Sequence, residues 1–528
     1  MKRTSRLTTQ VGFTALMLLA LGLISLFLWR EANAAQHPVL VPTLVPTALA
    51  AAETPTVPPS PTPLPATYTR IPTVTPPPNS SPTPRPSPTP TNEPTPTATA
   101  TLVPSATPTA AATVRVNGTR FDGTVIPPLT PVSTAIPTAV PTFEVPDEIT
   151  TILLLGSDVV GATGRTDTMI LVAINRNLKT ASMLSLPRDL YVYIPGWTMN
   201  RLNTAMARGD SQGYPGGGIA LLSDTILYNF GVPVDYYAQV DFASFKTVVD
   251  SIGGVDLTVT CGYSDWRLKS PELDVQVEEN WEMFTLDRGI QHMDGDLALW
   301  YARSRLRSSD FDRGRRQQQL LRAIFNKGVD VNLLGEIPTL WETYRETVRT
   351  NLDIGTILQL ATIAPQVREN GIQNLYVVGN DQIRSWTVPE TGAAVQLPNW
   401  EKMSETFTRL YLPPSLNRAT RPPITVELLN ATGDPVMMAL AAENMAWYGF
   451  VPIANETTVG VQQNTVINYY ADNFKASYDW LLSWVMDERA GAIQLVPQTP
   501  YPYNYQVTIG TEYDPCRPAL YAPQIDLE

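Results

Sequence analysis

The stretch TDTMILVAINRNLKTASMLSLPRD, residues 166–189, indicates the fold of the central part of this 528-residue chain. Two apolar runs are separated by an Arg-Asn pair, a pattern typical of two β-strands joined by a turn. The run ITTILLLGSD, residues 149–158, predicts a buried strand before them. Charged residues stand at or just beyond the ends of these three strands: Asp158, Asp167, Arg188 and Asp189. Because strand ends bring distant residues to one rigid edge of a sheet, we expect these side chains to converge.

Helical and extended patterns alternate after this stretch. They predict a helix over residues 218–230, the strand VDYYAQVDF, a helix over 242–251 and the strand VDLTVT. Such alternation is typical of helices packed on the faces of one sheet. We therefore predict an α/β sandwich, with a mixed central β-sheet flanked by helices, over residues 147–412.

The segment LWYARSRLRSSDFDRGRRQQQLL, residues 299–321, concentrates arginine in a chain whose net charge is −12. Six arginines and no lysine fall within residues 303–316. A solvated helix face is the ordinary explanation for such a run. A site for a phosphate-like ligand is the alternative, since arginine offers a rigid and permanently charged fork of donors.

Helical spacing favours the ligand site. An extended backbone over ARSRL would place Arg303 and Arg305 on the same side, after a helix capped by Asp294. On a second helix that begins near Asp310, the polar pair Arg313 and Gln317 prolongs the apolar stripe, so we expect the pair to face inward. Three other arginines are predicted to be ordinary surface charges: Arg307, Arg315 and Arg322.

Composition excludes several other kinds of site. The isoelectric point near 4.9 argues against a general nucleic-acid binder. The only histidines are His37 and His292, so histidine-based acid–base catalysis is not expected. Two cysteines, Cys261 and Cys516, are too few for a zinc module.

The N-terminal region predicts an anchor and a stalk. Residues 1–10 are basic, and residues 11–29 contain no charge over about the length that crosses a bilayer. These features predict a cytoplasmic N-terminus, one transmembrane helix and an extracellular remainder of the chain, although cleavage after Ala32-Asn33-Ala34 stays open. Residues 30–146 hold 28 of the 49 prolines and predict a disordered Pro/Thr-rich linker.

At this point the chain resembles the LytR-CpsA-Psr family. The resemblance rests on the ordered motifs GSD, GRTDTMILVAIN, MLSLPRDLYVYIPG, RLN, VDYYAQVDFASFKTVVDSIGGVDLTV, MDGDLALWYARSR and SDFDRGRRQQ. It implies a membrane-anchored phosphotransferase that moves a glycopolymer from a polyprenyl-pyrophosphate lipid to peptidoglycan or another wall acceptor. It also implies an apolar tunnel for the lipid between sheet and helices, for which Phe242 and Phe245 are candidates, although both are equally good core residues.

The resemblance assigns roles to residues of this chain. Asp158 and Asp167 correspond to the aspartates that organise Mg²⁺ (or Mn²⁺), a hard cation that suits carboxylate and phosphate oxygens. The implied pyrophosphate-binding residues are Arg188, Arg303, Arg305, Arg313 and Gln317. Arg188 and Arg303 are also counted among the implied catalytic residues. Asp189 is the third, either as base or by orienting Arg188. Arg201 stands where the family has a lysine.

The remainder of the chain predicts a second domain. After a linker over residues 413–423, alternating strands and helices predict a small α/β domain over 424–528, which resembles the LytR C-terminal domain. It contains no set of acid, base and nucleophile, so an accessory binding module is our hypothesis. Outside the cell Cys261 and Cys516 could pair and join the two domains, a question that the sequence leaves open.

Two other functions need the same site. A lipid pyrophosphatase would use water in place of the acceptor, and a non-catalytic sensor or attenuator would only bind wall lipids. The presence of both aspartates and all four arginines argues against the sensor.

Overall fold

The computed structural model describes residues 136–158, 166–306, 308–330, 337–344, 348–379, 381–470, 478–488, 493–496 and 501–516. The predicted cytoplasmic segment, membrane helix and stalk up to residue 135 lie outside these ranges. Within them, no helix combines the length and the apolar character needed to cross a membrane.

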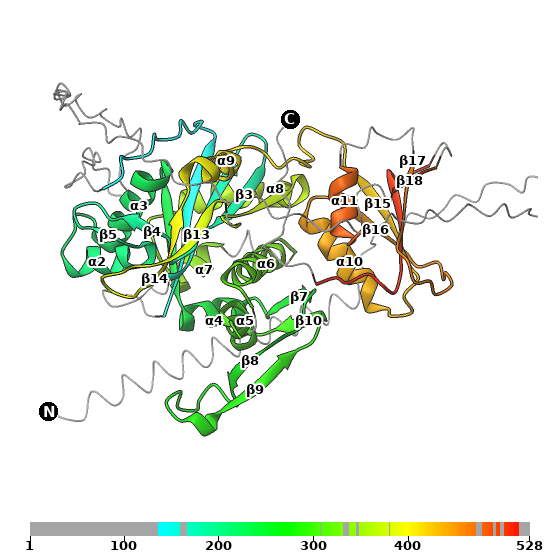
Figure 1. The fold of residues 1–528 in the computed structure, drawn as a ribbon, viewed down its shortest axis with the longest axis horizontal. Coiled ribbons are helices and arrows are strands. Elements are labelled where there is room, and N and C mark those ends of the chain that lie inside the picture. The colour runs from blue at the N-terminus through cyan, green and yellow to red at the C-terminus, as the bar shows by residue number, and fades with distance from the viewer. Residues whose placement is uncertain are drawn as a thin grey trace, which may run out of the picture. The chain divides into compact units, whose positions relative to one another are not determined.

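A six-stranded sheet forms the centre of the first domain (Figure 1), with the order β11-β6-β1-β2-β3-β12. β1 pairs antiparallel with β2 and β2 with β3, whereas β6 and β12 pair parallel with β1 and β3. The predicted mixed sheet is therefore confirmed. The strands are β1 (Ile149–Ser157), β2 (Thr166–Asn175), β3 (Thr180–Ser185), β6 (Tyr236–Asp241), β11 (Arg349–Thr350) and β12 (Ile372–Tyr376).

Helices pack on this sheet as predicted. The helix expected over 242–251 is α4 (Phe242–Ser251), and the one expected over 218–230 begins one residue earlier. Asp294 caps α5, as predicted, by accepting a hydrogen bond from the backbone N–H of Leu297 at 2.8 Å. The other helices are α2 (Ala205–Ser211), α3 (Gly217–Phe230), α5 (Gly295–Arg303), α6 (Asp310–Asp330), α7 (Ile337–Tyr344), α8 (Ile354–Asn370) and α9 (Trp400–Tyr411).

The two faces of the sheet have different surroundings because successive strand residues point to opposite sides. On one face Leu153 and Leu155 are buried in the main core, together with Phe407 of α9 and Leu222 of α3. On the other face Leu154 lines a cavity beneath α4, α5 and α6. Successive side chains of β1 thus point alternately to the core of the domain and to the side of the cavity.

The packed chain begins earlier than the predicted boundary at residue 147. The N–H of Val140 donates to the carbonyl of Tyr228, and the N–H of Phe143 donates to that of Gly231, both at 2.9 Å. The ring of Phe143 also lies 6.3 Å from the ring of Trp400. Residues 136–146 were assigned to the stalk because proline and threonine dominate them, and this part of the linker prediction is corrected. A few apolar side chains are enough to fix such a short segment to an existing surface.

Four two-stranded ribbons complete the domain, and most of their strands were not predicted. They are β4 (Tyr191–Tyr193) with β5 (Met199–Arg201), β7 (Val255–Val259) with β10 (Gly289–Met293), β8 (Tyr263–Leu268) with β9 (Trp281–Leu286), and β13 (Ile383–Thr387) with β14 (Ala394–Pro398). Only β7 was expected. The hairpin β8–β9 projects beside α4 and α5 in Figure 1.

The C-terminal residues form the predicted small α/β domain. Its five-stranded sheet has the order β16-β15-β19-β17-β18. Leu440 of α10 and Leu481 of α11 are fully buried in its core with Val426 of β15. The elements are β15 (Thr425–Asn430), α10 (Val436–Trp447), β16 (Val451–Asn455), β17 (Val466–Tyr470), α11 (Asp479–Val485), β18 (Ile493–Val496) and β19 (Tyr505–Ile509).

Candidate functional site

A cavity of about 480 Å³ lies between the second face of the sheet and helices α4, α5 and α6. Apolar side chains from both layers line it: Leu154, Ile170, Ala238, Val240, Phe242, Phe245, Leu299, Leu320 and Leu321. Phe242 and Phe245, which the sequence left open between core and tunnel, therefore border the cavity. A space of this kind suits an apolar chain.

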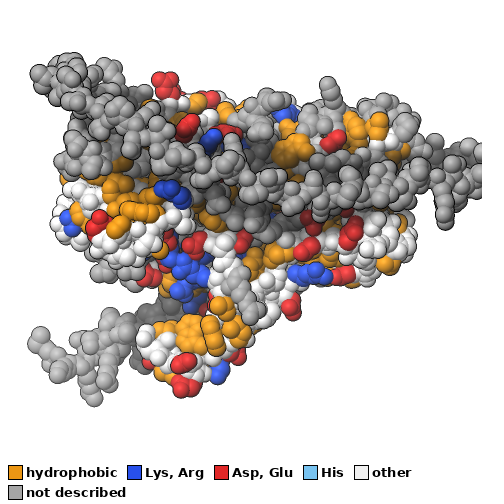
Figure 2. All heavy atoms as spheres, viewed as in Figure 1, with side chains coloured by type: hydrophobic (Ala, Val, Ile, Leu, Met, Phe, Trp, Pro, Cys, Tyr) orange, Lys and Arg blue, Asp and Glu red, His pale blue; other side chains and the backbone are white. Residues whose placement is uncertain are grey.

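Charged side chains line the same cavity. They come from distant parts of the sequence. Together with the neutral Gln317, five of them account for six of the eight predicted site residues: Asp167, Arg188, Arg303, Arg305, Arg313 and Gln317. Asp189 lines a small adjoining cavity of about 40 Å³ together with Arg188 and Arg313. In Figure 2 a group of Lys and Arg side chains with carboxylates beside it lies on the visible face directly above the β8–β9 hairpin. Asp167, Arg188 and Asp189 therefore converge as expected, whereas Asp158 lines neither cavity.

Arg188 connects two of the predicted aspartates. Its guanidinium Nη1 lies 2.5 Å from a carboxylate oxygen of Asp167, and its Nε lies 3.4 Å from Asp189. Asp189 is also 3.7 Å from Nε of Arg201. Burial opposes the charging of Arg188, but its contacts with the two carboxylates outweigh burial and raise the pKa of Arg188. The arginine is therefore held charged and in a fixed orientation.

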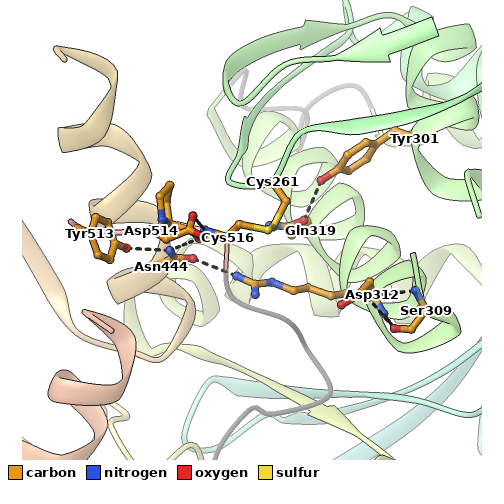
Figure 3. Close-up of a disulfide and its surroundings, with 11 residues drawn as sticks. Cys261, Tyr301, Ser309, Asp312, Gln319, Asn444, Tyr513, Asp514 and Cys516 are labelled. Carbon is orange, nitrogen blue, oxygen red and sulfur yellow. Dashed lines mark hydrogen bonds between the residues drawn. A yellow bond between two sulfur atoms is a disulfide. The ribbon is translucent and has the colours of Figure 1, made fainter. Parts of the chain in front are cut away.

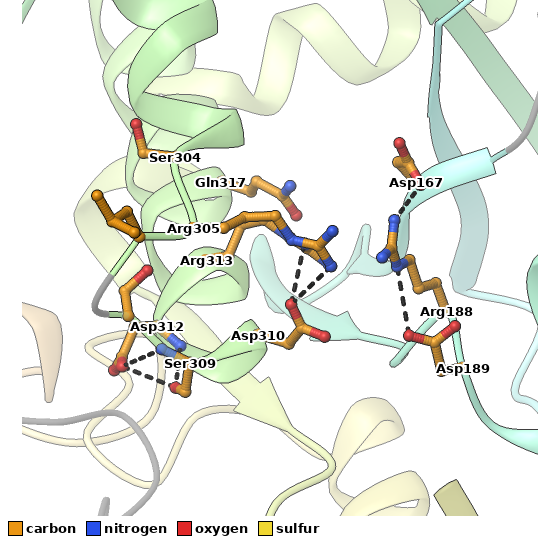
Figure 4. Close-up of polar contacts among 12 residues, drawn as sticks. Asp167, Arg188, Asp189, Ser304, Arg305, Ser309, Asp310, Asp312, Arg313 and Gln317 are labelled. Atoms are coloured by element: carbon orange, nitrogen blue, oxygen red, sulfur yellow. Dashed lines mark hydrogen bonds and ion pairs between the residues drawn. The ribbon is translucent and has the colours of Figure 1, made fainter. Parts of the chain in front are cut away.

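Arg305 and Arg313 face Arg188 from the opposite side of the site (Figure 4). Both contact the same carboxylate oxygen of Asp310, at 3.1 Å and 3.0 Å. Burial, aided by repulsion from Arg305 and Arg188, lowers the pKa of Arg313 to about 10 despite Asp310. Arg313 stays charged at neutral pH, and on this side of the site two guanidinium groups share one carboxylate. Such an arrangement favours a ligand that carries more than one negative charge.

Arg303 occupies the junction between the charged and apolar parts of the cavity. Its guanidinium carbon lies 4.2 Å from the ring centroid of Phe242, a cation–π contact. Burial lowers the pKa of Arg303, while the charges of Asp167 and Asp158 act against this decrease. Asp158 is exposed and does not line the cavity, but its negative charge acts to raise the pKa of Arg303.

The backbone at Arg303 differs from the prediction. Arg303 is the last residue of α5 rather than part of an extended segment. Arg303 and Arg305 nevertheless line one cavity because the chain leaves the helix between them. The prediction that both arginines face the same side is correct, but the extended backbone from which it was made is wrong.

Arg316 was not predicted to have a role, yet it fixes the loop that carries Arg305. It is completely buried, and it donates to the carbonyl oxygens of Tyr301 and Ser304 at 2.7 Å and 2.5 Å. A third bond reaches the hydroxyl of Ser308 at 3.0 Å. The sequence around Arg316 does not predict this role, because the loop closes only when α5 and α6 pack together.

The β8–β9 hairpin and the start of α6 also hold the loop. A carboxylate oxygen of Asp265 accepts from the backbone N–H groups of Arg305 and Leu306, at 2.6 Å and 3.1 Å. Ser309 and Asp312 exchange side-chain and backbone hydrogen bonds at the first turn of α6, an arrangement that caps the helix. Arg305 and Arg313 are thus presented from a loop and a helix end that are both anchored.

The prediction that Arg315 and Arg322 are surface charges is wrong. Arg315 is 5% exposed, and its Nη2 donates to the side-chain oxygen of Asn444 at 3.0 Å. Both guanidinium groups lie over the ring of Trp447, at 5.4 Å and 4.9 Å from its centroid. Asn444 and Trp447 belong to α10 of the C-terminal domain, so these arginines hold a domain contact that helical spacing cannot reveal. Arg307 lies outside the described residues.

A disulfide joins the same two domains. Cys261 and Cys516, 255 residues apart in sequence, are bonded (Figure 3). Near it the side-chain nitrogen of Asn444 donates to the hydroxyl of Tyr513 and the carbonyl of Pro515, at 2.9 Å and 2.8 Å. The pairing that the sequence left open is therefore present, next to the Arg315 contact.

Asp158 and Asp167 would be the protein ligands of a divalent cation that shares its coordination with a substrate. Within the described ranges, no three His, Cys, Asp or Glu side chains gather as a metal cage made by protein alone. Asp158 and Asp167 both act on the charge of Arg303. Mg²⁺ needs only one or two carboxylates when phosphate oxygens and water complete its coordination.

Comparisons with known proteins give one consistent family. The model of the LytR_cpsA_psr family matches residues 132–410. TagT of Bacillus subtilis, a polyisoprenyl-teichoic acid–peptidoglycan teichoic acid transferase, is 30% identical over 237 residues, which cover 44% of this chain and 68% of TagT. TagU of Bacillus licheniformis and TagV of Bacillus subtilis carry the same activity name and are 30% and 31% identical, over 66% and 54% of their own lengths and 42% of this chain in each case.

Solved structures are similar over about half of the chain. The crystal structure of B. subtilis TagV has a TM-score of 0.41 and 26% identity, covering 50% of this chain and 98% of TagV. A structure of YwtF (TagT) with bound octaprenyl pyrophosphate lipid has a TM-score of 0.36 and 26% identity, covering 52% of this chain and 94% of that one. Because the family model spans more than half of its residues, this chain belongs to the LytR-CpsA-Psr family.

Proposed function

We propose that this chain transfers a glycopolymer from a polyprenyl-pyrophosphate carrier to peptidoglycan or another cell-wall acceptor. The observation that carries the proposal is the single cavity in which an apolar body opens onto Arg188, Arg303, Arg305 and Arg313. A polyprenyl pyrophosphate has the matching composition, because an apolar chain ends in a group with two negative charges. Membership of the family and the transferase names of the relatives TagT, TagU and TagV support it.

The residues of this chain have distinct tasks in the proposed reaction. Arg313 and Arg188 bind the phosphate oxygens from two sides and stabilise the charge that develops on them. The acceptor hydroxyl oxygen forms a bond to the phosphorus that carries the glycopolymer, and the bond from this phosphorus to the polyprenyl-phosphate oxygen breaks. Polyprenyl phosphate leaves as a stable anion, so no strong general acid is needed. Asp189, beside Arg188, is the proposed base that removes the proton of the hydroxyl.

Asp158 and Asp167 are the proposed ligands of Mg²⁺ or Mn²⁺. When bound there, the cation would neutralise part of the charge on the pyrophosphate oxygens. Arg188 contacts the carboxylate of Asp167 and keeps it oriented toward the site.

We further propose that the domain acts outside the cell, anchored by the apolar segment at residues 11–29. A lipid-linked donor and a wall acceptor meet at the outer face of the cell membrane, so the reaction requires the domain on that side. Protease added to intact, wall-stripped cells should digest the folded domains. Protection until the cells are lysed would contradict this location.

The central experiment supplies a polyprenyl-pyrophosphate-linked glycopolymer and a peptidoglycan acceptor to the detergent-extracted full chain. We expect polymer joined to the acceptor by a phosphodiester, with release of polyprenyl phosphate. If water is the only group that receives the glycopolymer, even with the peptidoglycan acceptor in excess, the protein is a hydrolase instead. Lipid that copurifies with the protein, identified by mass spectrometry, checks the donor class independently.

A further inference from the structure

A second cavity, of about 260 Å³, lies on the opposite face of α6 from the arginine site. Arg322 and Asn326 of α6 line it, each nine residues after Arg313 and Gln317 of the first site. Nine residues are two and a half turns of helix, which places the two pairs on opposite sides. The remaining walls come from α8, β12, α9, the segment at residues 414–418 and the end of α10.

The lining of this second cavity is cationic. Four arginines contribute to it: Arg322, Arg368, Arg409 and Arg418. Among the described residues that line it, none is an aspartate or a glutamate. In a chain with net charge −12, four arginines around one cavity without a lining carboxylate form a local concentration of positive charge.

Neighbouring groups neutralise this charge only in part. Arg368 pairs with Asp330, and Nη1 of Arg418 donates to the backbone carbonyl of Glu369 at 2.7 Å. Burial lowers the pKa of Arg322, the charge of Arg418 adds to this decrease, and Glu443 opposes it. Arg418 therefore adds to the positive charge around Arg322.

Several hydrogen-bond donors in the cavity wall are unused. Among the described residues, Nη1 of Arg322, Nε of Arg418 and the hydroxyl of Tyr376 are buried without a hydrogen-bond partner. Buried donors normally find partners, and leaving them unpaired is costly. An oxyanion in the cavity would supply acceptors for donors of this kind and would offset the positive charge of the lining arginines. The stacking of Arg322 on Trp447 keeps its guanidinium plane fixed for such a contact.

Acceptors without partners line the same cavity. The side-chain oxygens of Gln373 and Asn374 are buried and have no hydrogen-bond donor among the described residues. Such oxygens suit the hydroxyl groups of a ligand. We propose that this cavity binds the phosphate group of a phosphorylated polyol or sugar, with Arg322, Arg418 and Tyr376 as donors to the phosphate. The proposal does not rest on the transfer reaction, because Arg322 and Arg418 lie outside the first site, although Tyr376 also borders the small cavity that adjoins it.

Calorimetric titration of the detergent-extracted full chain tests this site. The probes are inorganic phosphate, glycerol 3-phosphate as a monoester and glycerophosphoglycerol as a diester. A titration with a chloride salt at the same ionic strength is the chloride reference. Binding of the monoester alone points to a small metabolite, and binding of the diester points to a phosphodiester-linked polymer. Either result supports a phosphate site, whereas heat indistinguishable from the chloride reference for all three probes overturns it.

Variants locate the binding. Arg322→Gln and Arg418→Gln should each weaken binding of the preferred probe more than tenfold, because each removes a charged donor. Arg384→Gln is the control, since Arg384 is an exposed arginine on β13 that does not line the cavity. Arg313→Ala should leave the binding of this probe unchanged. Loss of binding in Arg313→Ala with retention in the Arg322 and Arg418 variants would assign the phosphate to the first site and contradict the proposal.

Discussion

Arg313 and Arg315 lie two residues apart on α6, and their guanidinium groups belong to opposite sides of that helix. Arg313 contacts Asp310 at 3.0 Å, at the cavity between sheet and helices, whereas Arg315 donates to Asn444 of the C-terminal domain at 3.0 Å. Helix α6 is thus a wall shared by the candidate catalytic site and the domain contact.

The first prediction separates these two sides. Arg313→Ala should weaken binding of a polyprenyl pyrophosphate by more than tenfold, since a lost hydrogen bond to a charged group costs about 1.5–3 kcal/mol. Arg303→Ala and Arg305→Ala should act in the same direction. Arg315→Ala should leave lipid affinity unchanged and lower the melting temperature, because it breaks the contact with Asn444. Equal small effects of all four variants on affinity would restore the explanation of a solvated arginine face.

The second prediction concerns the metal. Asp158→Asn and Asp167→Asn should abolish transfer to a peptidoglycan acceptor and should weaken donor binding less than turnover, because the arginines remain in place. EDTA should have the same effect on the unchanged protein, with recovery on addition of Mg²⁺ or Mn²⁺. Full activity of both variants in the presence of EDTA would show that the assigned metal role is wrong.

The third prediction concerns the apolar part of the cavity. Ala238 of β6 lines it, so Ala238→Trp should fill the space and exclude a long polyprenyl chain. We expect at least a tenfold loss of affinity for a long-chain pyrophosphate and little change for a carrier of two isoprene units. Ala243→Trp, at an exposed position on α4, is the control. The same loss for short and long carriers would mean that the lipid chain lies elsewhere.

The fourth prediction concerns the disulfide. Because Cys261 and Cys516 are 255 residues apart, their bond restricts the unfolded chain strongly, and Cys516→Ser should lower stability by up to about 5 kcal/mol. Thermal unfolding with and without reductant measures the effect, and reductant should not change the stability of the variant. Thiol labelling of both cysteines in the unreduced, folded protein would exclude the bond.

Local patterns were enough for the strands and helices that support the site. Apolar runs and the Arg-Asn turn fixed β1, β2 and β3, and the helix over 242–251 was predicted with its observed ends. The grouping of Arg313 with Gln317 was also correct, since both line one cavity. These features depend on neighbours within a few residues, where periodicity and capping carry the information.

The tertiary structure decided which arginine does what. Arg315, Arg316 and Arg322 are indistinguishable by local pattern, yet Arg316 closes a loop and the other two meet Trp447 from the C-terminal domain. The sequence predicts Asp310 as the start of a helix, and the structure shows in addition that its carboxylate contacts both Arg305 and Arg313. The sequence by itself therefore determined the family, the sheet and the convergence of charge. The partner of each charge was decided only by packing, because burial and pairing depend on residues that are distant in sequence and approach only in the folded chain.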